Sequence, residues 1–441
     1  MDVSKTAAPN LSTRHSHDVV ATTLEPLPQP GVPFMNQSLR IGIVGGSISG
    51  MCTAVVLSRL GHDVTVLEKS RGQLRERGAG LGFAISNAER WRSLNLFDED
   101  LVGIRVHTRR WSVKDGNSYL GRTLFEHPMA IENHSWGSVY GQLLKRSGKA
   151  RIEPGMAVEK VTSNDERATV HLVGGAQLSF DLVVGADGYQ SVVQDGLFPL
   201  SEKHFAGYVA WRGIVSEDRL SDISPVVGVM ESVGTPRGNA IFNAIPGQGG
   251  TTEEGNRLVT LLWYEAHTPL DILPTELGPD GKHHPTSIPA GSMSQQVLTH
   301  LNTMADEVLP AWHADVVHRS LDPFLQPIYD VRQDHYIHKR VALVGDAAST
   351  ARPHTGSGAS KGIGDAVALA EALDQSTSVE EALHRYDAER VRTGDQIVTL
   401  GRLVGDDTIL NAPDWHHIDQ DHMAKWIETG PQSLVYYHVN R

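Results

Sequence analysis

The feature that most constrains this chain is a glycine-rich turn, Gly45-Gly46-Ser47-Ile48-Ser49-Gly50. An apolar run at 40–44 precedes the turn, and apolar residues at helical spacing follow it as far as Gly61, a typical helix stop. A second apolar run at 64–67 ends in Glu68. Strand, turn, helix and strand in this order predict a βαβ unit, and therefore a parallel sheet.

The same turn predicts nucleotide binding. A dinucleotide fingerprint has glycine at its first, third and sixth positions, which are here Gly45, Ser47 and Gly50. Ser47 departs from that pattern and adds a side chain where a backbone should approach a pyrophosphate. The start of the following helix offers unpaired N–H groups to phosphate. Glu68 lies about 20 residues on, at the spacing of a ribose-binding acid. The turn alone fits NAD and FAD equally.

Composition excludes several classes of protein. The 441 residues carry 39 basic and 52 acidic side chains, a net charge of −13, which argues against general nucleic-acid binding. The single cysteine, Cys52, excludes an intrachain disulfide framework and a cysteine-built zinc site. No pattern of metal ligands stands out. No run approaches the ~18 apolar residues of a membrane span, and residues 1–38 have neither a signal-peptide nor a transit-peptide pattern. We expect a disordered tail at 1–38 and a cytoplasmic protein.

Two further motifs follow. Residues 181–191 are an apolar strand and a turn containing Asp187, and residues 344–358 contain Gly345-Asp346 and lead into a helix that carries Asp365. Either motif alone is compatible with an ordinary structural turn. All three motifs, in this order and at these separations, are specific.

With these motifs the chain resembles the FAD-dependent aromatic hydroxylases of the para-hydroxybenzoate hydroxylase type, from about Arg40 to about Leu403. Within that family it is most similar to the 2,6-dihydroxypyridine 3-monooxygenase branch. The stretches that carry this closer resemblance, including the branch's own serine at 47, are 46–50, 207–213, 245–247, 263–264 and 352–354.

The resemblance implies a non-covalently bound FAD and a transient NADPH or NADH, for which the sequence offers no second strand–turn–helix unit. It places Asp346 on the ribityl chain and gives Asp187 a role beneath the pyrophosphate and in the use of NAD(P)H. The cofactor-binding residues expected on this basis are Gly45, Ser47, Ile48, Ser49, Gly50, Glu68, Lys69, Gly82, Tyr140, Asp187, Asp346, Gly356, Ser357, Gly358, Ala359 and Ser360. Three positions depart from the wider family: Gln194 and Tyr140 replace arginines, and Ser349 replaces a histidine.

The expected fold is α/β, with a Rossmann-like FAD-binding domain interrupted by a sheet-rich substrate domain. We assign 39–110, 135–195 and 335–405 to the first domain, and 111–134 and 196–334 to the second. Alternating apolar residues between 156 and 184 predict a short β meander. Residues 406–441 form a C-terminal extension.

The expected activity is hydroxylation of an activated aromatic or N-heteroaromatic ring, such as a hydroxypyridine, by a flavin C4a-hydroperoxide made from O2. Tyr208 and Arg212 lie four apart on one strand and therefore face the same side. His354 would deprotonate the ring hydroxyl, Tyr208 would hydrogen-bond the oxyanion and Arg212 would stabilise its charge, with His204 a weaker candidate base. A homodimer is possible.

Several alternatives stay open. Salicylate or another phenolic acid, or a larger secondary metabolite, would also suit such an enzyme. A flavin dehydrogenase or oxidase, or a flavoprotein without catalytic activity, is less favoured. Ordinary sheet packing would equally explain Tyr208, Trp211, Trp263 and Tyr264, since aromatic residues are enriched in strands.

Overall fold

A six-stranded sheet forms the centre of the first half of the molecule. The computed structural model describes residues 37–72, 80–198, 202–267 and 291–439. The strand order is β16-β17-β10-β1-β2-β6, and all neighbours are parallel except β16 and β17. The strands are β1 (Arg40–Val44), β2 (Asp63–Glu68), β6 (Arg151–Pro154), β10 (Leu182–Gly185), β16 (Ile337–His338) and β17 (Val341–Leu343).

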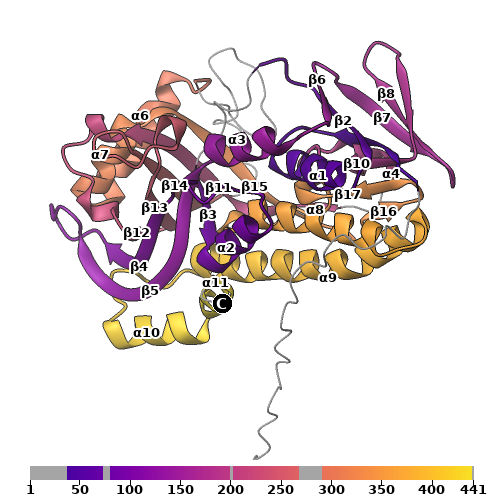
Figure 1. Cartoon of the computed structure of the whole chain (residues 1–441). Coiled ribbons are helices and arrows are strands. Elements are labelled where there is room, and N and C mark those ends of the chain that lie inside the picture. The colour runs from indigo at the N-terminus through magenta and orange to yellow at the C-terminus, as the bar shows by residue number, and fades with distance from the viewer. Residues whose placement is uncertain (1–36, 73–79, 199–201, 268–290, 440–441) are drawn as a thin grey trace, which may run out of the picture.

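Helices cover this sheet and give it a nearly continuous apolar core. The burial of β1, β10 and β17 on both faces is typical of parallel strands between helical layers. In Figure 1, α9 runs along the lower side of the molecule next to α8. The helices are α1 (Ile48–Arg59), α2 (Ile85–Ser93), α3 (Trp136–Arg146), α4 (Val192–Leu197), α8 (Gly358–Asp374) and α9 (Val379–Gly405).

An eight-stranded sheet forms the second half, with the order β15-β11-β14-β13-β12-β4-β5-β3. Helices α6 (Gln295–Val308) and α7 (Ala311–Arg319) lie beside it at the left of Figure 1. Short 3-10 turns η2 to η6 lie at 217–219, 224–226, 248–250, 345–347 and 353–355. The strands are β3 (Gly80–Ala84), β4 (Ile104–Val113), β5 (Arg122–Ser135), β11 (Glu202–Ser216), β12 (Val229–Thr235), β13 (Gly238–Ile245), β14 (Leu258–Ala266) and β15 (Leu321–Arg332).

The sheets divide the chain differently from the expected boundaries. Strands β3 and β4 belong to the eight-stranded sheet, although we assigned residues 39–110 to the FAD-binding domain. The reason is the long strand β5, which pairs with β4 along one edge and with β3 along the other, and so draws both into its sheet.

The expected meander forms a separate three-stranded antiparallel sheet of β7 (Val158–Ser163), β8 (Ala168–Leu172) and β9 (Gln177–Phe180). The last predicted strand is split at Asp181, whose carboxylate accepts a hydrogen bond from the backbone N–H of Arg40 at 2.8 Å. Beyond Asp181 the chain enters the six-stranded sheet as β10.

The residues after α9 pack onto the eight-stranded sheet. Helix α9 passes directly into a π-helical turn, η7 (Asp406–Leu410), and two helices follow, α10 (Gln420–Thr429) and α11 (Gln432–Val439). Trp415 stacks on Trp111 of β4 with ring centroids 5.3 Å apart, and Trp426 meets both rings edge-on. Within the described ranges, the helices lack the combination of length and apolar character that a membrane crossing needs.

Candidate active site

The glycine-rich turn is as tight as its sequence predicts. Gly45 has a φ of +99°, and its N–H bonds to the carbonyl of Leu67 at 2.9 Å. A Cβ added at Gly45 would lie 2.5 Å from the Ala186 carbonyl oxygen, and one at Gly50 would lie 1.9 Å from the Gly45 oxygen. Glycine is therefore required at both positions. Ser47 is exposed and its side chain does not cap α1, so the first N–H groups of that helix face outward for an anion.

Glu68 is fixed at the edge of this turn. One carboxylate oxygen accepts from the backbone N–H of Gly46 at 2.8 Å and the other from that of Ser70 at 2.8 Å. Each carboxylate oxygen has a second lone pair, so Glu68 can still accept a hydrogen bond from a ribose hydroxyl. Lys69, the neighbouring candidate, is exposed beside it.

Asp187 has a structural role that the sequence did not indicate. Its carboxylate accepts from the Ser191 hydroxyl and from the N–H groups of Val192 at 2.8 Å and Val193 at 3.4 Å, and so it fixes the start of α4. Gln194 then donates from Nε2 to the Ala347 carbonyl at 2.7 Å. This glutamine, which replaces a family arginine, joins the second motif to the third. The predicted role of Asp187 in flavin reduction stays a prediction.

The first and third motifs meet at Ser49. A Cβ added at Gly345 would lie 2.3 Å from the Ser49 hydroxyl oxygen, and one at Gly362 would lie 2.1 Å from it. Next to Gly345, the Asp346 side chain is exposed to water, although surrounding protein raises the pKa of its carboxyl by desolvation.

The loop after Asp346 leads to the start of α8. Gly356 adopts a left-handed conformation with a φ of +61°, and α8 starts two residues later. The hydroxyl of Ser357 bonds to the carbonyl of Thr355 and does not cap α8. The first N–H groups of α8, in the turn that contains Gly358, Ala359 and Ser360, are therefore left for another partner.

The eight-stranded sheet presents two different faces. Trp211 and Trp263 pack into the core shared with α6 and α7. Their neighbours Tyr208, Ala210 and Tyr264 point to the opposite face, where they pack with Ile409 of η7. The ladder pairs Ala210 with Tyr264, so the two tyrosines lie on adjacent strands of one face. Ordinary sheet packing thus accounts for the two tryptophans, and the tyrosines belong to the site.

Tyr208 and His354 meet at this face. The Tyr208 hydroxyl lies 2.7 Å from His354 Nε2, and the Tyr264 ring lies 4.3 Å from the His354 ring, centroid to centroid. A Cβ at Gly405, the last residue of α9, would lie 2.2 Å from the Tyr208 oxygen and 3.0 Å from His354 Nε2. The backbone of α9 therefore closes one side of the pair. The hydroxyl of Tyr264 is buried without a partner.

Electrostatics keep this histidine neutral. Burial, together with the nearby charges of Arg352 and Arg109, lowers the pKa of His354 to about 3. Arg352 is itself held by two carboxylates, Asp330 at 2.9 Å and Asp406 at 2.7 Å. Burial also raises the pKa of Tyr208. Both members of the hydrogen-bonded pair are thus uncharged at neutral pH.

Arg212 lies on the same face as Tyr208. Its Nη1 donates to the Gln326 side chain at 3.0 Å, and its guanidinium lies 5.9 Å from the ring centre of Phe324. Burial lowers the pKa of Arg212. Within the described residues no carboxylate pairs with this cation, so its charge is available to an anionic group.

Other predicted residues lie apart from this pair. His204 is exposed near the start of β11. Tyr140 is buried in α3, where it stacks on Trp136 with ring centroids 5.0 Å apart. Gly82 lies in β3, and a Cβ there would approach the Asn133 side chain to 3.2 Å. Residues 73–79, which directly precede β3, fall outside the described residues.

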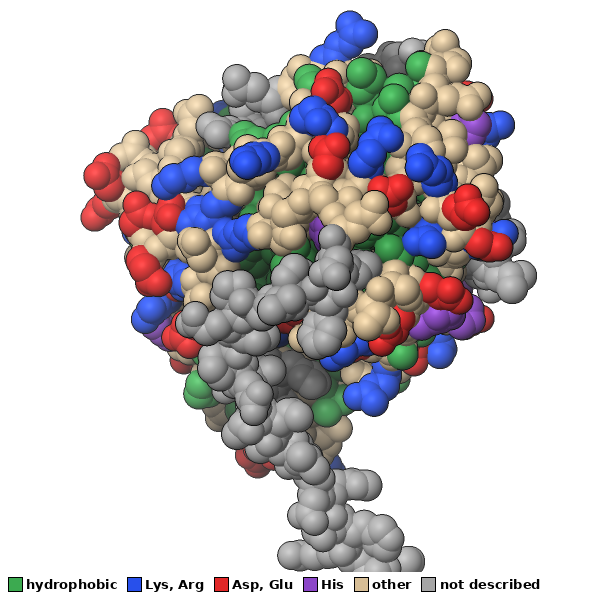
Figure 2. Space-filling view, turned by 45° about the vertical axis from the view of Figure 1, so that its right-hand side comes forward, with side chains coloured by type: hydrophobic (Ala, Val, Ile, Leu, Met, Phe, Trp, Pro, Cys, Tyr) green, Lys and Arg blue, Asp and Glu red, His purple; other side chains and the backbone are tan. Residues whose placement is uncertain are grey.

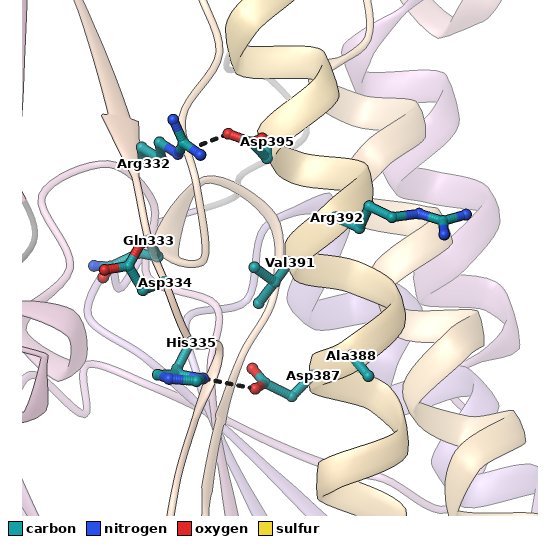
Figure 3. Close-up of a pocket in the computed structure, with 9 residues that line it drawn as sticks. All are labelled: Arg332, Gln333, Asp334, His335, Asp387, Ala388, Val391, Arg392 and Asp395. Atoms are coloured by element: carbon teal, nitrogen blue, oxygen red, sulfur yellow. Dashed lines mark hydrogen bonds and ion pairs between the residues drawn. The ribbon is translucent and has the colours of Figure 1, made fainter.

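A surface pocket of about 320 Å³ between the end of β15 and α9 contains none of the predicted residues. Figure 3 shows its charged groups paired across the gap, with Arg332 on Asp395 at 2.7 Å and His335 on Asp387 at 2.9 Å. On the face drawn in Figure 2, basic and acidic side chains lie intermixed. Among the residues with described positions, no three potential metal ligands gather.

Comparisons with known proteins agree with this geometry. Family models described as an FAD binding domain-like region, an FAD binding domain and an NAD(P)-binding Rossmann-like domain match residues 205–330, 288–400 and 43–72. The chain is 29% identical over 364 residues to 2,6-dihydroxypyridine 3-monooxygenase of Paenarthrobacter nicotinovorans, covering 80% of this chain and 88% of the relative. It is 25% identical over 393 residues to salicylate hydroxylase of Pseudomonas putida, covering 79% and 81%.

A solved structure shares the fold. The 2,6-dihydroxypyridine-3-hydroxylase from Arthrobacter nicotinovorans superposes with a TM-score of 0.77 at 25% identity, over 86% of this chain and 94% of that one. The chain resembles the FAD-dependent aromatic hydroxylases. The predictions of the α/β fold, of FAD as cofactor and of an enzyme of the FAD-dependent monooxygenase type are confirmed.

The residues of the three motifs fit FAD. The tight turn at 45–50 with its outward N–H groups suits a pyrophosphate, and Glu68 has lone pairs left for a ribose. Asp346, exposed next to Gly345, suits a ribityl hydroxyl. The uncapped start of α8 would lie against the flavin ring. Sequence reasoning gave no role to Arg352, Gly405 and Asp406, which lie beside the Tyr208–His354 pair, and left Tyr264 open between sheet packing and the site. The alternation of β14 gave a signal for Tyr264, but nothing local marks Gly405 or Asp406.

Proposed function

We propose that this enzyme hydroxylates an aromatic or N-heteroaromatic ring that carries an ionisable hydroxyl group, with a hydroxypyridine as the preferred substrate. Bound FAD, reduced by NADPH or NADH, would supply the activation of O2. The observation that carries the proposal is the 2.7 Å contact between Tyr208 and His354 at the end of the Gly-Asp loop. The relative that acts on 2,6-dihydroxypyridine supports the choice of ring.

The chain's own groups would prepare the ring for attack. Electrophilic hydroxylation needs an electron-rich ring, which a hydroxypyridine becomes when its hydroxyl loses a proton. In the tautomer whose Nε2–H donates to the Tyr208 oxygen, a neutral His354 keeps its lone pair on Nδ1 for the ring hydroxyl, and Tyr208 holds the orientation of the imidazole. Because the surroundings disfavour an imidazolium ion, His354 would accept a hydrogen bond from the ring hydroxyl while the proton itself leaves to solvent water. Arg212 would stabilise the oxyanion that develops.

Salicylate is the second candidate. Arg212 has no carboxylate partner in the described part of the chain, and its charge would suit a substrate carboxylate as well as a ring oxyanion. The salicylate hydroxylase relative supports this option. A hydroxypyridine without a carboxylate separates the two candidates, because only the first would accept it.

The test is a panel of hydroxypyridines and hydroxybenzoates, scored by NAD(P)H consumed against hydroxylated product formed. We expect tight coupling with a hydroxypyridine. His354→Ala should keep NAD(P)H oxidation but release H2O2 in place of product. His204→Ala, at an exposed position on the same strand as Tyr208, is the matched control and should stay coupled. Fully coupled hydroxylation by His354→Ala from pH 6 to 9 would place the base elsewhere.

A further inference from the structure

Two unpaired polar groups lie on the face of the eight-stranded sheet that carries Tyr208. The Tyr264 hydroxyl and the Asn239 side-chain oxygen Oδ1 are both buried, and within the described residues neither has a hydrogen-bond partner. Leaving a buried polar atom unpaired is unfavourable, so each such atom needs an explanation. Other buried polar atoms of the chain are also unpaired, among them Thr235 Oγ1. What distinguishes the first two is their position relative to each other and to His354.

The side chains of Asn239 and Tyr264 are direct neighbours. The two residues pair in the ladder between β13 and β14, so their side chains leave the sheet on the same face, with Cβ atoms about 4.5–5.5 Å apart. Ile241, two residues further along β13, packs in one cluster with both site tyrosines, which identifies this face as that of the site. The Tyr264 ring lies 4.3 Å from the His354 ring. A donor and an acceptor without partners therefore lie together next to the candidate base.

Buried positive charge lies on both sides of this pair. Arg212 belongs to β11, the strand next to β14. On the other side, Arg109 of β4 donates from Nε to the hydroxyl of Ser232 at 2.8 Å, and Ser232 belongs to β12, the strand next to β13. Two cations favour a ligand group with partial negative charge, such as the oxygen of an amide-type carbonyl.

We propose, on the basis of the proposed function, that Asn239 and Tyr264 recognise the amide-type edge of a 2-pyridone, in which a ring N–H lies directly beside a carbonyl group. A 2-hydroxypyridine has this edge in its keto tautomer. Asn239 Oδ1 would accept from the ring N–H, and the Tyr264 hydroxyl would donate to the carbonyl oxygen. Both unpaired atoms then gain a partner. A phenolic ring, including that of salicylate, has no ring N–H and leaves Asn239 Oδ1 unpaired.

The experiment is isothermal titration calorimetry of the FAD-loaded enzyme without NAD(P)H. The three probes are 4-hydroxy-2-pyridone, its N-methyl derivative and resorcinol, of which only the first has a ring N–H. We expect 4-hydroxy-2-pyridone to bind about tenfold or more tightly than either analogue, because each analogue leaves a buried acceptor unpaired.

Variants assign this preference to the two residues. Asn239→Leu removes the acceptor and should abolish the preference for 4-hydroxy-2-pyridone over resorcinol, whereas Asn239→Asp keeps an acceptor oxygen and should keep the preference. Tyr264→Phe should weaken the binding of 4-hydroxy-2-pyridone about tenfold but retain the preference for a ring N–H. Thr235→Val is the matched control. It also removes a buried, unpaired polar atom, but on the opposite face, and should bind all three probes like wild type.

Circular dichroism melting identifies any variant that fails to fold. An Asn239→Leu enzyme that keeps the wild-type preference would overturn the inference. So would a wild-type enzyme that binds 4-hydroxy-2-pyridone and resorcinol equally, and this comparison decides the question if Asn239→Leu does not fold. Either result leaves the proposed function standing while hydroxypyridines are hydroxylated with tight coupling. Absence of coupled hydroxylation for every hydroxypyridine in the panel would instead contradict the proposed function.

Discussion

At the scale of single residues, the site depends on groups that are kept uncharged next to groups that are fully charged. His354 is hydrogen-bonded to the Tyr208 hydroxyl, and its imidazole stays neutral because burial, and after it the positive charges of Arg352 and Arg109, lower its pKa. Arg352 keeps its charge because Asp330 and Asp406 pair with it. A histidine kept neutral in this way has a lone pair free at physiological pH.

This neutrality predicts a pH-dependent stability. Unfolded His354 has a pKa near ~6.5, whereas the folded value is about 3, so the unfolded chain binds the proton first as pH falls. Stability that is fully present above pH ~6.5 is therefore lost as pH falls toward 3. His354→Gln cannot titrate, so the difference in unfolding free energy between wild type and this variant should shrink by about 2 kcal/mol between pH 7.5 and 5. Urea denaturation at both pH values measures it, and a constant difference would contradict a neutral His354.

At the scale of elements, the end of α9 packs directly against the Tyr208–His354 pair. The helix leaves the α-helical pattern at Gly405 and continues as a π turn, a form that often marks functional sites. Asp406 reaches back to Arg352 and Ile409 packs among Tyr208 and Tyr264. The segment that we set apart as a C-terminal extension thus contacts the candidate site through Asp406 and Ile409.

Gly405→Ala tests the contact between the end of α9 and the Tyr208–His354 pair. The added methyl would overlap the Tyr208 hydroxyl, so the Tyr208–His354 hydrogen bond must break or α9 must shift, at a cost of about 1–3 kcal/mol. We expect lower stability together with uncoupled NAD(P)H oxidation. Gly141→Ala in α3 is the control, because a Cβ there meets nothing within 4 Å and should stabilise the helix by about 0.5–1 kcal/mol. A Gly405→Ala enzyme with wild-type coupling would show that this contact has no role.

The elements were largely predictable from local pattern. The first βαβ unit, the meander and helices α8 and α9 follow from apolar periodicity and from glycine at their ends. The Tyr208–His354 contact was not predictable in the same way, because 146 residues separate its partners. The residues behind it, Gly405 and Asp406, carry no local signal at all. When the backbone of a helix packs against a side chain that is distant in the sequence, no periodic pattern in the sequence indicates that contact.

At the scale of the whole molecule, the two large sheets are joined by buried charge. Asp330 belongs to β15 of the eight-stranded sheet, and its carboxylate accepts from Arg352 at 2.9 Å and from Arg402 of α9 at 2.8 Å. Sequence reasoning correctly expected one domain to interrupt the other, but periodicity did not show that β3 and β4 pair into the eight-stranded sheet. Strand partners depend on which edges are free, and single-sequence periodicity does not contain that information.

Asp330→Asn should therefore weaken the joint between the sheets. Its loss leaves Arg352 with Asp406 alone and Arg402 without its carboxylate partner, which for a buried pair costs about 3 kcal/mol. Asp395→Asn is the matched control, since Asp395 also links α9 to β15, through Arg332, but in a solvent-exposed pair worth less than about 1 kcal/mol. Chemical denaturation followed by fluorescence compares the two. Equal losses of unfolding free energy in both variants would show that the buried ion pairs of Asp330 stabilise the protein no more than the exposed pair does.

The π turn after α9 also has a consequence for how such enzymes diversify. The segment 405–410 contacts Tyr208, Tyr264 and His354 and belongs to none of the three nucleotide-binding motifs. Exchange of this short segment between relatives would therefore alter which ring is accepted while leaving the cofactor machinery intact. Recombination at this segment, or a library confined to these six codons, is thus a direct route to new substrates.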